Sequence, residues 1–315
     1  MTPAKGDGVE VRHLRCLAAV VDAGGFTDAA IDLGLSQPTV SRTLAALEGA
    51  LGVRLLRRTS RELVLTAAGE RVLARARRVL AEVDDLVRDA RTGHGRLRVG
   101  HAWAAVGEHT VEFQQRWSHR HPAVELHLVR TNSPTGGLAE GVCDVAVVRA
   151  PAQVDRTDHH RFDSAVVGVE ARWCALAAGD PLARRRQLRL ADLADRVLAV
   201  DHRTGTTTLD LWPPDRRPAV EETRDVDDWL AVIAAGRCVG VTAESTSTQY
   251  RRQGVVFRPL RGAPPVPVRL VWWRDGPHPA VPDVVALLAD LYRGDDRRPR
   301  RAWATVRTGD DARDS

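Results

Sequence analysis

Several features that would mark a secreted or membrane protein are missing from this chain of 315 residues. Its four cysteines lie far apart and form no Cys-x-x-Cys pair, which favours a reduced intracellular protein with small buried thiols. No apolar run reaches the roughly 18 residues that a membrane span needs, and the polar start, "MTPAKGDGVE", has no apolar signal core. We therefore expect a cytoplasmic protein with no membrane partner.

The motifs of common enzyme classes are also missing. The sequence has no Gly-x-Ser-x-Gly elbow, no phosphate-loop pattern and no His-Glu-x-x-His pair. Its close histidine groups are His119 with His121 and His159 with His160, and neither brings a third ligand at the spacing of a metal site. We expect no catalysis, no bound metal and no other cofactor.

Lysine is almost absent, since Lys5 is the only one and arginine supplies the other basic charges. The formal net charge is +5, and this mild excess only weakly favours a nucleic-acid partner. Hydrophobic content of 43% and charged content of 28% are typical of a soluble globular protein. The length predicts two or three domains.

The first fifty residues predict three helices with two tight turns. Apolar residues recur at helical spacing before Gly24-Gly25: Leu14, Leu17, Ala18 and Val21. Thr27 is expected to cap a second helix and Gly34 to end it, because glycine adopts the left-handed conformation at little cost. Ser36 is expected to cap a third helix, whose apolar residues form one buried stripe: Val40, Leu44, Leu47 and Leu51.

The second and third helices together predict a helix-turn-helix, in which the later helix enters the DNA major groove with its N-terminus first. That end of the helix carries the expected DNA contacts: Ser36, Gln37, Pro38, Thr39, Ser41 and Arg42. Gln37 suits adenine and Arg42 suits guanine, while serine hydroxyls and the helix N-terminus suit phosphate.

A short basic hairpin, or wing, is predicted next. Leu55-Leu56 and the run "LVL" at 63–65 flank a polar tip with three arginines that we expect to contact DNA: Arg57, Arg58 and Arg61. Between residues 36 and 61, five arginines stand against one acid, Glu48, which gives a local charge of +4. The basic excess thus lies where a duplex would bind. The alternative is a solvated helix pair with a charged hairpin.

Residues 66–91 predict one long helix with apolar residues on two sides. A heptad seam runs along it: Val72, Ala76, Val79, Val83, Leu86 and Ala90. Leu73, Leu80 and Val87 lie beside the seam. The helix either packs on its own domain or pairs with the same helix of a second chain. We favour the pair, because a dimer presents two reading helices to a two-fold related site.

The run from Leu14 through Leu80 resembles the N-terminal part of LysR-type transcriptional regulators. The matching segments fall in the family's order and spacing: "SQPTVSR" at 36–42, Leu47-Glu48, "LGVRL" at 51–55, Arg58-Thr59 and "LTAAG" at 65–69. The resemblance implies a tetramer built as a pair of dimers that binds and bends promoter DNA, and that responds to a small molecule. A contact with RNA polymerase is compatible with the resemblance.

Strand and helix patterns alternate in the remaining residues. Strands are expected at 96–100, 124–130, 144–148, 172–178, 196–201, 238–244 and 268–273, and helices at 107–120, 137–141, 227–235 and 281–292. This alternation predicts a mostly parallel sheet covered by helices, a second α/β lobe, and a last strand and helix that return to the first lobe. Ligands of such sheets bind at the carboxyl ends of strands.

The resemblance implies the same architecture, an α/β multidomain chain. It consists of a winged helix-turn-helix (9–66), a linker helix (67–92) and an effector domain (93–293) similar to a two-lobed periplasmic binding protein. Lobe one covers 93–166 and 268–293, and lobe two covers 167–267. The tail, 294–315, mixes arginine with aspartate and is expected to be disordered.

The family's cleft positions, carried over to this sequence, give nine expected effector-binding residues: His101, Trp103, Thr131, Asn132, Arg149, Arg203, Thr204, Asp227 and Thr242. One departure concerns the stretch "GHAWAAVG" after the first strand, where members often have a serine or threonine that holds a carboxylate. Trp103 suits an aromatic ligand instead. A core role for Trp103, a surface ion pair for Arg149 and a turn at Thr131-Asn132 are the alternatives.

The leading hypothesis is therefore a LysR-type regulator that senses a small molecule. The alternative is a ligand-independent or architectural DNA-binding protein, whose α/β domain serves only oligomerisation. A plain solute-binding protein would not carry the wing arginines or the heptad helix, and an architectural protein would not need two hundred residues of α/β domain.

Overall fold

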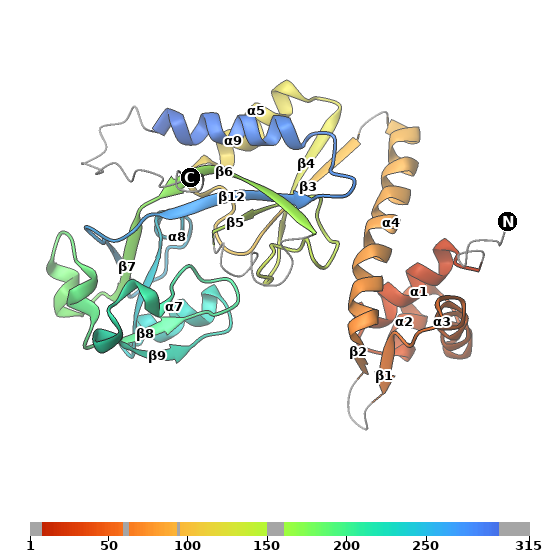
Figure 1. Cartoon of the computed structure of the whole chain (residues 1–315), viewed down its shortest axis with the longest axis horizontal. Helices are drawn as coiled ribbons and strands as arrows, with labels where there is room; N and C mark the ends of the chain where they lie inside the picture. Colours follow the sequence, from red (N-terminus) through yellow and green to blue (C-terminus); the bar gives the residue numbers. More distant parts are fainter. Residues whose placement is uncertain (1–7, 59–62, 93–94, 150–160, 296–315) are drawn as a thin grey trace, which may run out of the picture.

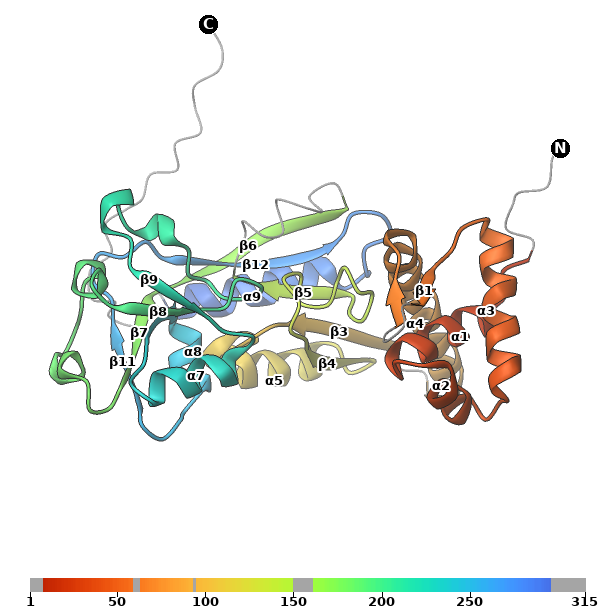
Figure 2. The ribbon, with the colours of Figure 1, turned by 90° about the horizontal axis from the view of Figure 1, so that it is seen from below.

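The computed structural model describes residues 8–58, 63–92, 95–149 and 161–295. Figure 1 shows an N-terminal helical domain, one long helix beside it, and two α/β lobes on the other side of that helix. Figure 2 shows helix α3 at the end of the molecule farthest from lobe two.

The N-terminal domain is built on α1 (Val11–Asp22), α2 (Phe26–Leu33) and α3 (Gln37–Leu51). Gly34 ends α2 in the left-handed conformation at φ 62°, as predicted. The expected cap at Thr27 is wrong: α2 already starts at Phe26, with Gly25 at the N-cap position. The backbone of Gly25 is extended, and a glycine there leaves the start of the helix without a side-chain cap.

The wing consists of β1 (Leu56–Arg58) and β2 (Leu63–Leu65), which pair antiparallel. Arg57 and Arg58, which were predicted to lie in the polar tip, belong to β1, and the rest of that tip, residues 59–61, lies outside the described residues. Glu48 of α3 fixes the wing, because its Oε1 accepts the backbone N–H groups of Leu55 at 2.6 Å and Leu56 at 3.2 Å. The wing is therefore attached directly to the helix expected to read DNA.

The long helix α4 (Ala67–Thr92) starts beside the wing. The Thr66 hydroxyl accepts from the Gly69 N–H at 2.9 Å, so Thr66 caps the helix that was predicted to include it. A Cβ at Gly69 would lie 2.0 Å from the carbonyl oxygen of Leu55. The Leu-Thr-x-x-Gly pattern therefore combines a helix cap with a close approach that only glycine permits.

The heptad seam of α4 and the apolar residues beside it, together called the α4 seam, divide into two parts. Leu73 and Ala76 are buried at 5% and 2% exposure, and α4 packs against α1. Farther along, Val79 is 45% exposed, Leu86 69% and Val87 44%. The packing within one chain thus accounts for the first half of the seam, and the second half stays open to a partner.

Lobe one has a five-stranded sheet in the order β4-β3-β5-β12-β6. Its strands are β3 (Gly95–His101), β4 (Val124–Arg130), β5 (Val145–Val148), β6 (Phe162–Glu170) and β12 (Val266–Trp273). Helices α5 (Thr110–Arg120) and α9 (Val281–Asp295) cover one face (Figure 1). Their apolar residues, with those of the strands, form a core that includes Phe113, Trp117, Leu287 and Leu288.

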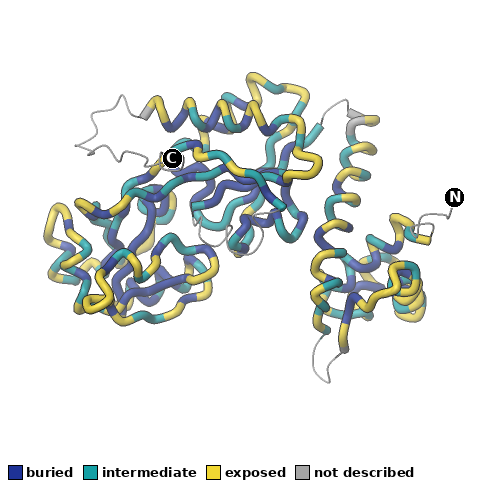
Figure 3. The backbone as a smooth tube through the Cα atoms, in the orientation of Figure 1, coloured by how far each residue is buried: buried dark blue, intermediate teal, exposed yellow. Residues whose placement is uncertain are grey.

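Lobe two has a second five-stranded sheet in the order β11-β7-β10-β8-β9. Its strands are β7 (Arg172–Ala177), β8 (Val197–Val200), β9 (Ala219–Glu222), β10 (Val239–Ala243) and β11 (Val255–Pro259). Helices α7 (Val226–Ala234) and α8 (Glu244–Gln249) follow β9 and β10. The chain also has short 3-10 helices: η1 (Gly107–His109), η2 (Pro181–Arg184), η3 (Leu190–Leu193), η4 (Leu209–Leu211) and η5 (Pro214–Arg216). Figure 3 shows buried strands in both lobes and exposed residues along α3.

Three expectations about the lobes need correction. Both sheets are mixed, not mostly parallel, because β12 runs antiparallel to β5 and β6, and β7 runs antiparallel to β10 and β11. Residues 137–141 form turns, not a helix, because Gly136, Gly137 and Gly141 adopt positive φ values. The expected end of lobe one at residue 166 falls inside β6, which stays in the lobe-one sheet until Glu170.

Of the expected tail, residues 294 and 295 belong to α9, and residues 296–315 lie outside the described part.

Lobe one is attached to α4 through two of its loops. A Cβ at Gly141 would lie 2.2 Å from the carbonyl oxygen of Ala74, so the two backbones touch. The Arg78 guanidinium lies 4.4 Å from the centroid of the Trp273 ring, and it donates to the carbonyl oxygens of Asp275 and Gly276 at 3.4 Å. Stacking and hydrogen bonds together fix lobe one against the helix that carries the N-terminal domain.

Candidate DNA interface and interlobe cleft

The N-terminal end of α3 is ordered by its own side chains. Ser36 occupies the N-cap position, and its hydroxyl accepts from the Thr39 N–H at 3.4 Å and lies 2.8 Å from the Thr39 hydroxyl. Pro38 lies in the first turn, where a missing N–H costs no helical hydrogen bond. On the opposite side, Val40, Leu44 and Leu47 are buried in the domain core.

The residues of α3 and its N-cap that are expected to contact DNA lie on the outer side of the helix. Ser36, Gln37, Pro38 and Arg42 are exposed, and Thr39 and Ser41 are half-buried. Among the described basic residues of α3 and the wing, Arg42, Arg54 and Arg57 are exposed and none has an ion pair. The Arg42 Nε donates only to the Pro38 carbonyl oxygen, at 3.4 Å. Of the other two wing arginines, Arg58 is described by its backbone alone and Arg61 lies outside the described part. A surface of unpaired guanidinium groups beside a helix N-terminus is suited to a phosphate backbone.

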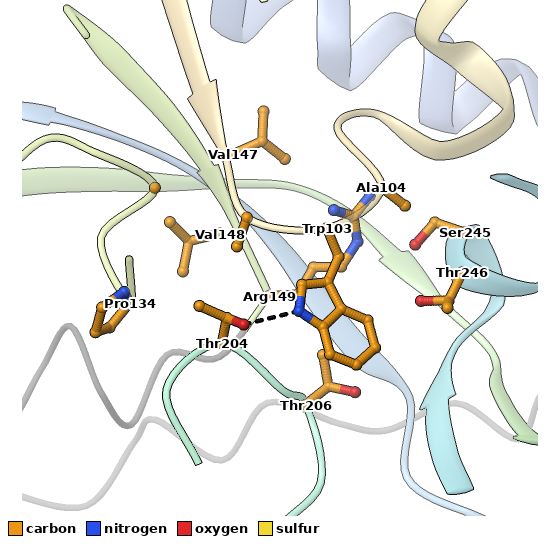
Figure 4. Close-up of a pocket in the computed structure, with 12 residues that line it drawn as sticks. Trp103, Ala104, Pro134, Val147, Val148, Arg149, Thr204, Thr206, Ser245 and Thr246 are labelled. Atoms are coloured by element: carbon orange, nitrogen blue, oxygen red, sulfur yellow. Dashed lines mark hydrogen bonds between the residues drawn. The ribbon is translucent and has the colours of Figure 1, made fainter. Parts of the chain in front are cut away.

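Trp103 occupies the middle of the cleft between the lobes (Figure 4). It follows β3 of lobe one, and its indole Nε1 donates to the Thr204 Oγ1 of lobe two at 2.7 Å. Its ring meets that of Trp229 edge to face, with centroids 5.4 Å apart, and its carbonyl oxygen accepts from the Tyr250 hydroxyl at 3.1 Å. One residue of lobe one thus makes three separate contacts with lobe two.

A cavity of about 30 Å³ remains beside the indole, which is room for roughly two water molecules. Lobe one contributes residues 102–104, Pro134, Gly136 and residues 147–149 to its lining, and lobe two contributes Thr204, Thr206, Ser245 and Thr246. Figure 4 shows the Trp103 ring between Thr204 on one side and Ser245 and Thr246 on the other. Among the described residues, the Trp103 ring thus occupies the centre of this part of the cleft.

Arg149, which was expected to hold the effector, belongs to a buried ion pair. Its Nη2 donates to the Glu170 Oε1 at 2.7 Å, its Nε donates to both Glu170 oxygens at 3.1 Å, and its Nη1 donates to the Ala105 carbonyl at 2.7 Å. The Tyr292 hydroxyl donates to the same carboxylate at 2.9 Å. The Arg149 charge holds the pKa of Glu170 below its ordinary value despite burial, and burial raises the pKa of Tyr292.

His101, Thr131 and Asn132 lie together at the carboxyl edge of the lobe-one sheet. The His101 Nδ1 lies 3.0 Å from the Trp103 carbonyl oxygen, and burial lowers the pKa of this histidine, which favours the neutral ring. The Asn132 amide donates to the Arg224 carbonyl of lobe two at 2.7 Å. The Thr131 hydroxyl is buried and has no hydrogen-bond partner in the described structure. Asn132 therefore acts as a second bridge between the lobes.

The other expected effector residues lie at the rim of the cleft or in the core. Thr204 is central, because it accepts the indole N–H and its own hydroxyl donates to Asp201. The Arg203 side chain is exposed, and Asp227, also exposed, lies 3.7 Å from Arg130 in an ion pair across the rim. Thr242 is 1% exposed and donates to the Thr246 hydroxyl at 2.7 Å, so it supports a lining residue.

Sequence reasoning missed Thr206, Ser245, Thr246 and Tyr250. Ser245 and Thr246 follow β10 directly, so the rule that ligands bind at the carboxyl ends of strands could have found them. Thr206 and Ser245 line the cavity, and their hydroxyls are buried with no hydrogen-bond partner in the described part of the chain. Nothing in the sequence indicated that the Tyr250 hydroxyl donates to the Trp103 carbonyl oxygen, because the two residues are 147 positions apart in the chain.

A winged helix-turn-helix with an unpaired arginine surface, followed by a long helix and a two-lobed domain with a cleft, defines a DNA-binding regulator with a ligand-binding domain. The family model described as "Bacterial regulatory helix-turn-helix protein, lysR family" matches residues 11–70, and the "LysR substrate binding domain" model matches residues 90–293. The chain belongs to the LysR family of transcriptional regulators. The model of the effector domain supports this assignment and not the architectural alternative.

Named relatives agree with the family assignment. The chain is 34% identical over 210 residues to the uncharacterized HTH-type transcriptional regulator YnfL of Escherichia coli (strain K12). The aligned region covers 64% of this chain and 69% of YnfL. It is 33% identical over 225 residues to the HTH-type transcriptional regulator BudR of Raoultella terrigena. The aligned region covers 68% of this chain and 71% of BudR. The crystal structure of CbnR, a LysR family regulator, superposes with a TM-score of 0.65 at 24% identity, over 91% of this chain and 99% of CbnR, and shows the shared fold.

The family's members are transcriptional regulators, not enzymes; they bind DNA and small-molecule effectors and assemble as oligomers. No helix in the described part of the chain is both long and apolar enough to cross a bilayer. Within the same described residues, no three His, Cys, Asp or Glu side chains are arranged to hold a metal ion.

Proposed function

We propose that this chain binds a two-fold related promoter site as a dimer, with Gln37 and Arg42 reading bases in successive major grooves. The phosphates on either side of these bases are held by Ser36, Ser41, Arg57, Arg58 and Arg61. Pro38 and Thr39 keep the first turn of α3 close to the DNA backbone. The observation that carries this proposal is the surface formed by the outer side of α3 and strand β1 of the wing, where Arg42 and Arg57 are exposed and free of ion pairs.

The dimer forms through the open half of the α4 seam. Val79, Leu86 and Val87 are large apolar side chains on one long helix, and each is 44% exposed or more. Pairing α4 with its copy removes this apolar surface from water and places two α3 helices on one duplex. Two such dimers form the homotetramer that the family resemblance implies, and the tetramer works in the cytoplasm.

The interlobe cleft receives a small-molecule effector. Trp103, Thr131, Asn132 and Thr204 lie at the carboxyl ends of strands, where ligands of α/β sheets bind. Binding changes how the lobes are held together, which changes the spacing or bend between the two dimers and so the access of RNA polymerase to the promoter.

The test is fluorescence anisotropy of the purified full-length chain on its own upstream DNA and on scrambled DNA of equal length, across a salt series. A sequence-reading regulator keeps a preference for the upstream DNA at physiological salt, while nonspecific binding falls steeply with salt. Equal affinity for both DNAs at every salt concentration would contradict the base-reading role.

A further inference from the structure

The described wall of the interlobe cavity consists mostly of small apolar and hydroxyl residues around the Trp103 ring. Arg149 is the only charged residue of the described cavity wall, and its N–H groups point to Glu170, Tyr292 and the Ala105 carbonyl. A carboxylate placed in the cavity would therefore find no free cation, and burying an unpaired charge is costly.

The position taken by the Trp103 indole has the contacts of a ligand subsite. The Thr204 hydroxyl accepts one hydrogen bond from the ring, at 2.7 Å, and Trp229 offers an aromatic edge-to-face contact at 5.4 Å. Next to the ring, the Ser245 hydroxyl, in a residue that is 3% exposed, and the Thr206 hydroxyl have no partner in the described part of the chain. Buried hydroxyls are normally hydrogen-bonded, so these two favour a further polar group beside the ring.

We propose that Trp103 is a tethered occupant of the effector cleft, and that the effector is a neutral planar ring with an N–H or O–H donor that takes the place of the indole between Thr204 and Trp229. This proposal rests on the proposed function, because it names the ligand class and the regulation of that same cleft. The indole and the effector compete for one position, so effector binding replaces a contact between the lobes by a contact with the ligand.

The competition explains why the cavity is small. With the indole in place, about 30 Å³ remains, which is too little for a ring compound. When Trp103 leaves, lobe one loses its hydrogen bond to Thr204, while the Asn132 bond to the Arg224 carbonyl and the Arg130–Asp227 ion pair remain. The effector thus controls one of the bridges between the lobes and leaves the others intact.

Calorimetric titration of the full-length protein with indole tests the proposal, with indole-3-carboxylate as the charged match. Trp103→Ala removes the tethered ring, and it should bind indole at least about tenfold more tightly than the wild-type chain does. Trp103→Phe keeps a ring in the cleft but loses the donor to Thr204, so its indole affinity should lie between those of the wild type and Trp103→Ala. Trp272→Ala, which removes a half-buried tryptophan of β12 outside the described cavity lining, is the matched control and should gain nothing.

Two further measurements define the subsite. Adding Thr204→Val to Trp103→Ala should weaken indole binding about three- to tenfold, because the donor loses its acceptor. Indole-3-carboxylate should bind Trp103→Ala no more tightly than it binds the wild type. If Trp103→Ala does not fold, as judged by circular dichroism, Trp103→Leu makes the same test with less loss of packing.

Either of two results would overturn the proposal: a folded Trp103→Ala that binds indole no more tightly than the wild type, or carboxylated indole that binds as well as indole. The DNA anisotropy test separates this outcome from failure of the proposed function. A wild-type chain that prefers its upstream DNA, together with a Trp103→Ala variant that ignores indole, refutes the tethered occupant alone. A wild-type chain without that preference refutes the proposed regulator, while indole binding by Trp103→Ala still supports the tethered occupant.

Discussion

Arg149 and Glu170 form a buried ion pair, 2.7 Å between Nη2 and Oε1, at the point where β6 leaves lobe one and the chain enters lobe two. Their side chains are 9% and 7% exposed, and Tyr292 of α9 donates to the same carboxylate. The Ser245 N–H of lobe two also donates to Glu170, at 3.2 Å. The pair therefore holds β5, β6, α9 and lobe two together.

Replacing Glu170 with Gln leaves the Arg149 charge buried without its partner and should lower the free energy of unfolding by about 3–5 kcal/mol. Urea denaturation followed by circular dichroism measures this loss. The double variant Arg149→Met/Glu170→Leu should lose less than Glu170→Gln alone, because it removes both charges and keeps apolar volume. A double variant less stable than the single one would contradict this account of the pair.

The same pair predicts the acid dependence of stability. Burial alone would raise the pKa of Glu170, but the Arg149 charge and the hydrogen bonds from Arg149, Ser245 and Tyr292 together lower it in the folded chain. The stabilisation is therefore complete above the ordinary value of 4.5 and is lost as pH falls below it toward the folded pKa. Denaturation midpoints between pH 7 and pH 3 should fall less steeply for Glu170→Gln than for the wild type; parallel curves would show that Glu170 does not titrate in this way.

Arg42 and Arg57 should lose DNA affinity in different ways. Arg42→Ala should cost about 1–3 kcal/mol on the specific site and little on scrambled DNA, because a base contact is lost. Arg57→Ala should weaken both DNAs alike and reduce the salt slope by about 1, because a phosphate contact is lost. Anisotropy titrations at several salt concentrations measure both effects, and an equal loss for Arg42→Ala on both DNAs would remove its reading role.

Aspartates in the open half of the α4 seam should separate the dimer. Val79→Asp/Leu86→Asp changes two side chains that are 45% and 69% exposed in the single chain, so the fold of each chain should survive. Sedimentation velocity should then report monomers. Val197→Asp, at the 38% exposed start of β8, is the control for adding a charge to an exposed apolar position and should leave assembly unchanged. A double variant that still sediments as a dimer would place the interface elsewhere.

The four cysteines should be unreactive in the folded protein. Cys16, Cys143, Cys174 and Cys238 are all buried, and burial raises the pKa of each thiol, that of Cys238 to about 12. Thiolate, not thiol, is the nucleophile, so iodoacetamide at pH 7.5 should label none of them within minutes, and all four in urea. Mass spectrometry counts the labels. Rapid labelling of one cysteine without urea would reveal a site that opens in solution.

The sequence predicted the helix order, the caps at Ser36 and Gly34, and most strands, because these depend on local spacing and on single residues with strong preferences. It misplaced the start of α2 and the residues 137–141, where glycines control the backbone and side-chain patterns say little. The mixed sheets were missed because the direction of β12 depends on partners more than a hundred residues away. In the cleft, Trp103 and Thr204 were named from the sequence, but their contact was not, since it joins two lobes that only the folded chain brings together.

The turn at 132–141 touches three parts of the molecule. Asn132 donates a hydrogen bond to the Arg224 carbonyl of lobe two. Pro134 and Gly136 line the cleft, and Gly141 lies against the backbone of α4. The Glu140 carboxylate accepts from the Ser133 and Thr135 hydroxyls, at 2.9 and 3.2 Å, and so makes the segment one unit. For genetics, this means that a substitution in this turn that alters ligand binding should also alter the attachment of lobe one to α4. Phenotype alone will not separate the two defects, and each such allele needs ligand affinity and operator affinity measured side by side.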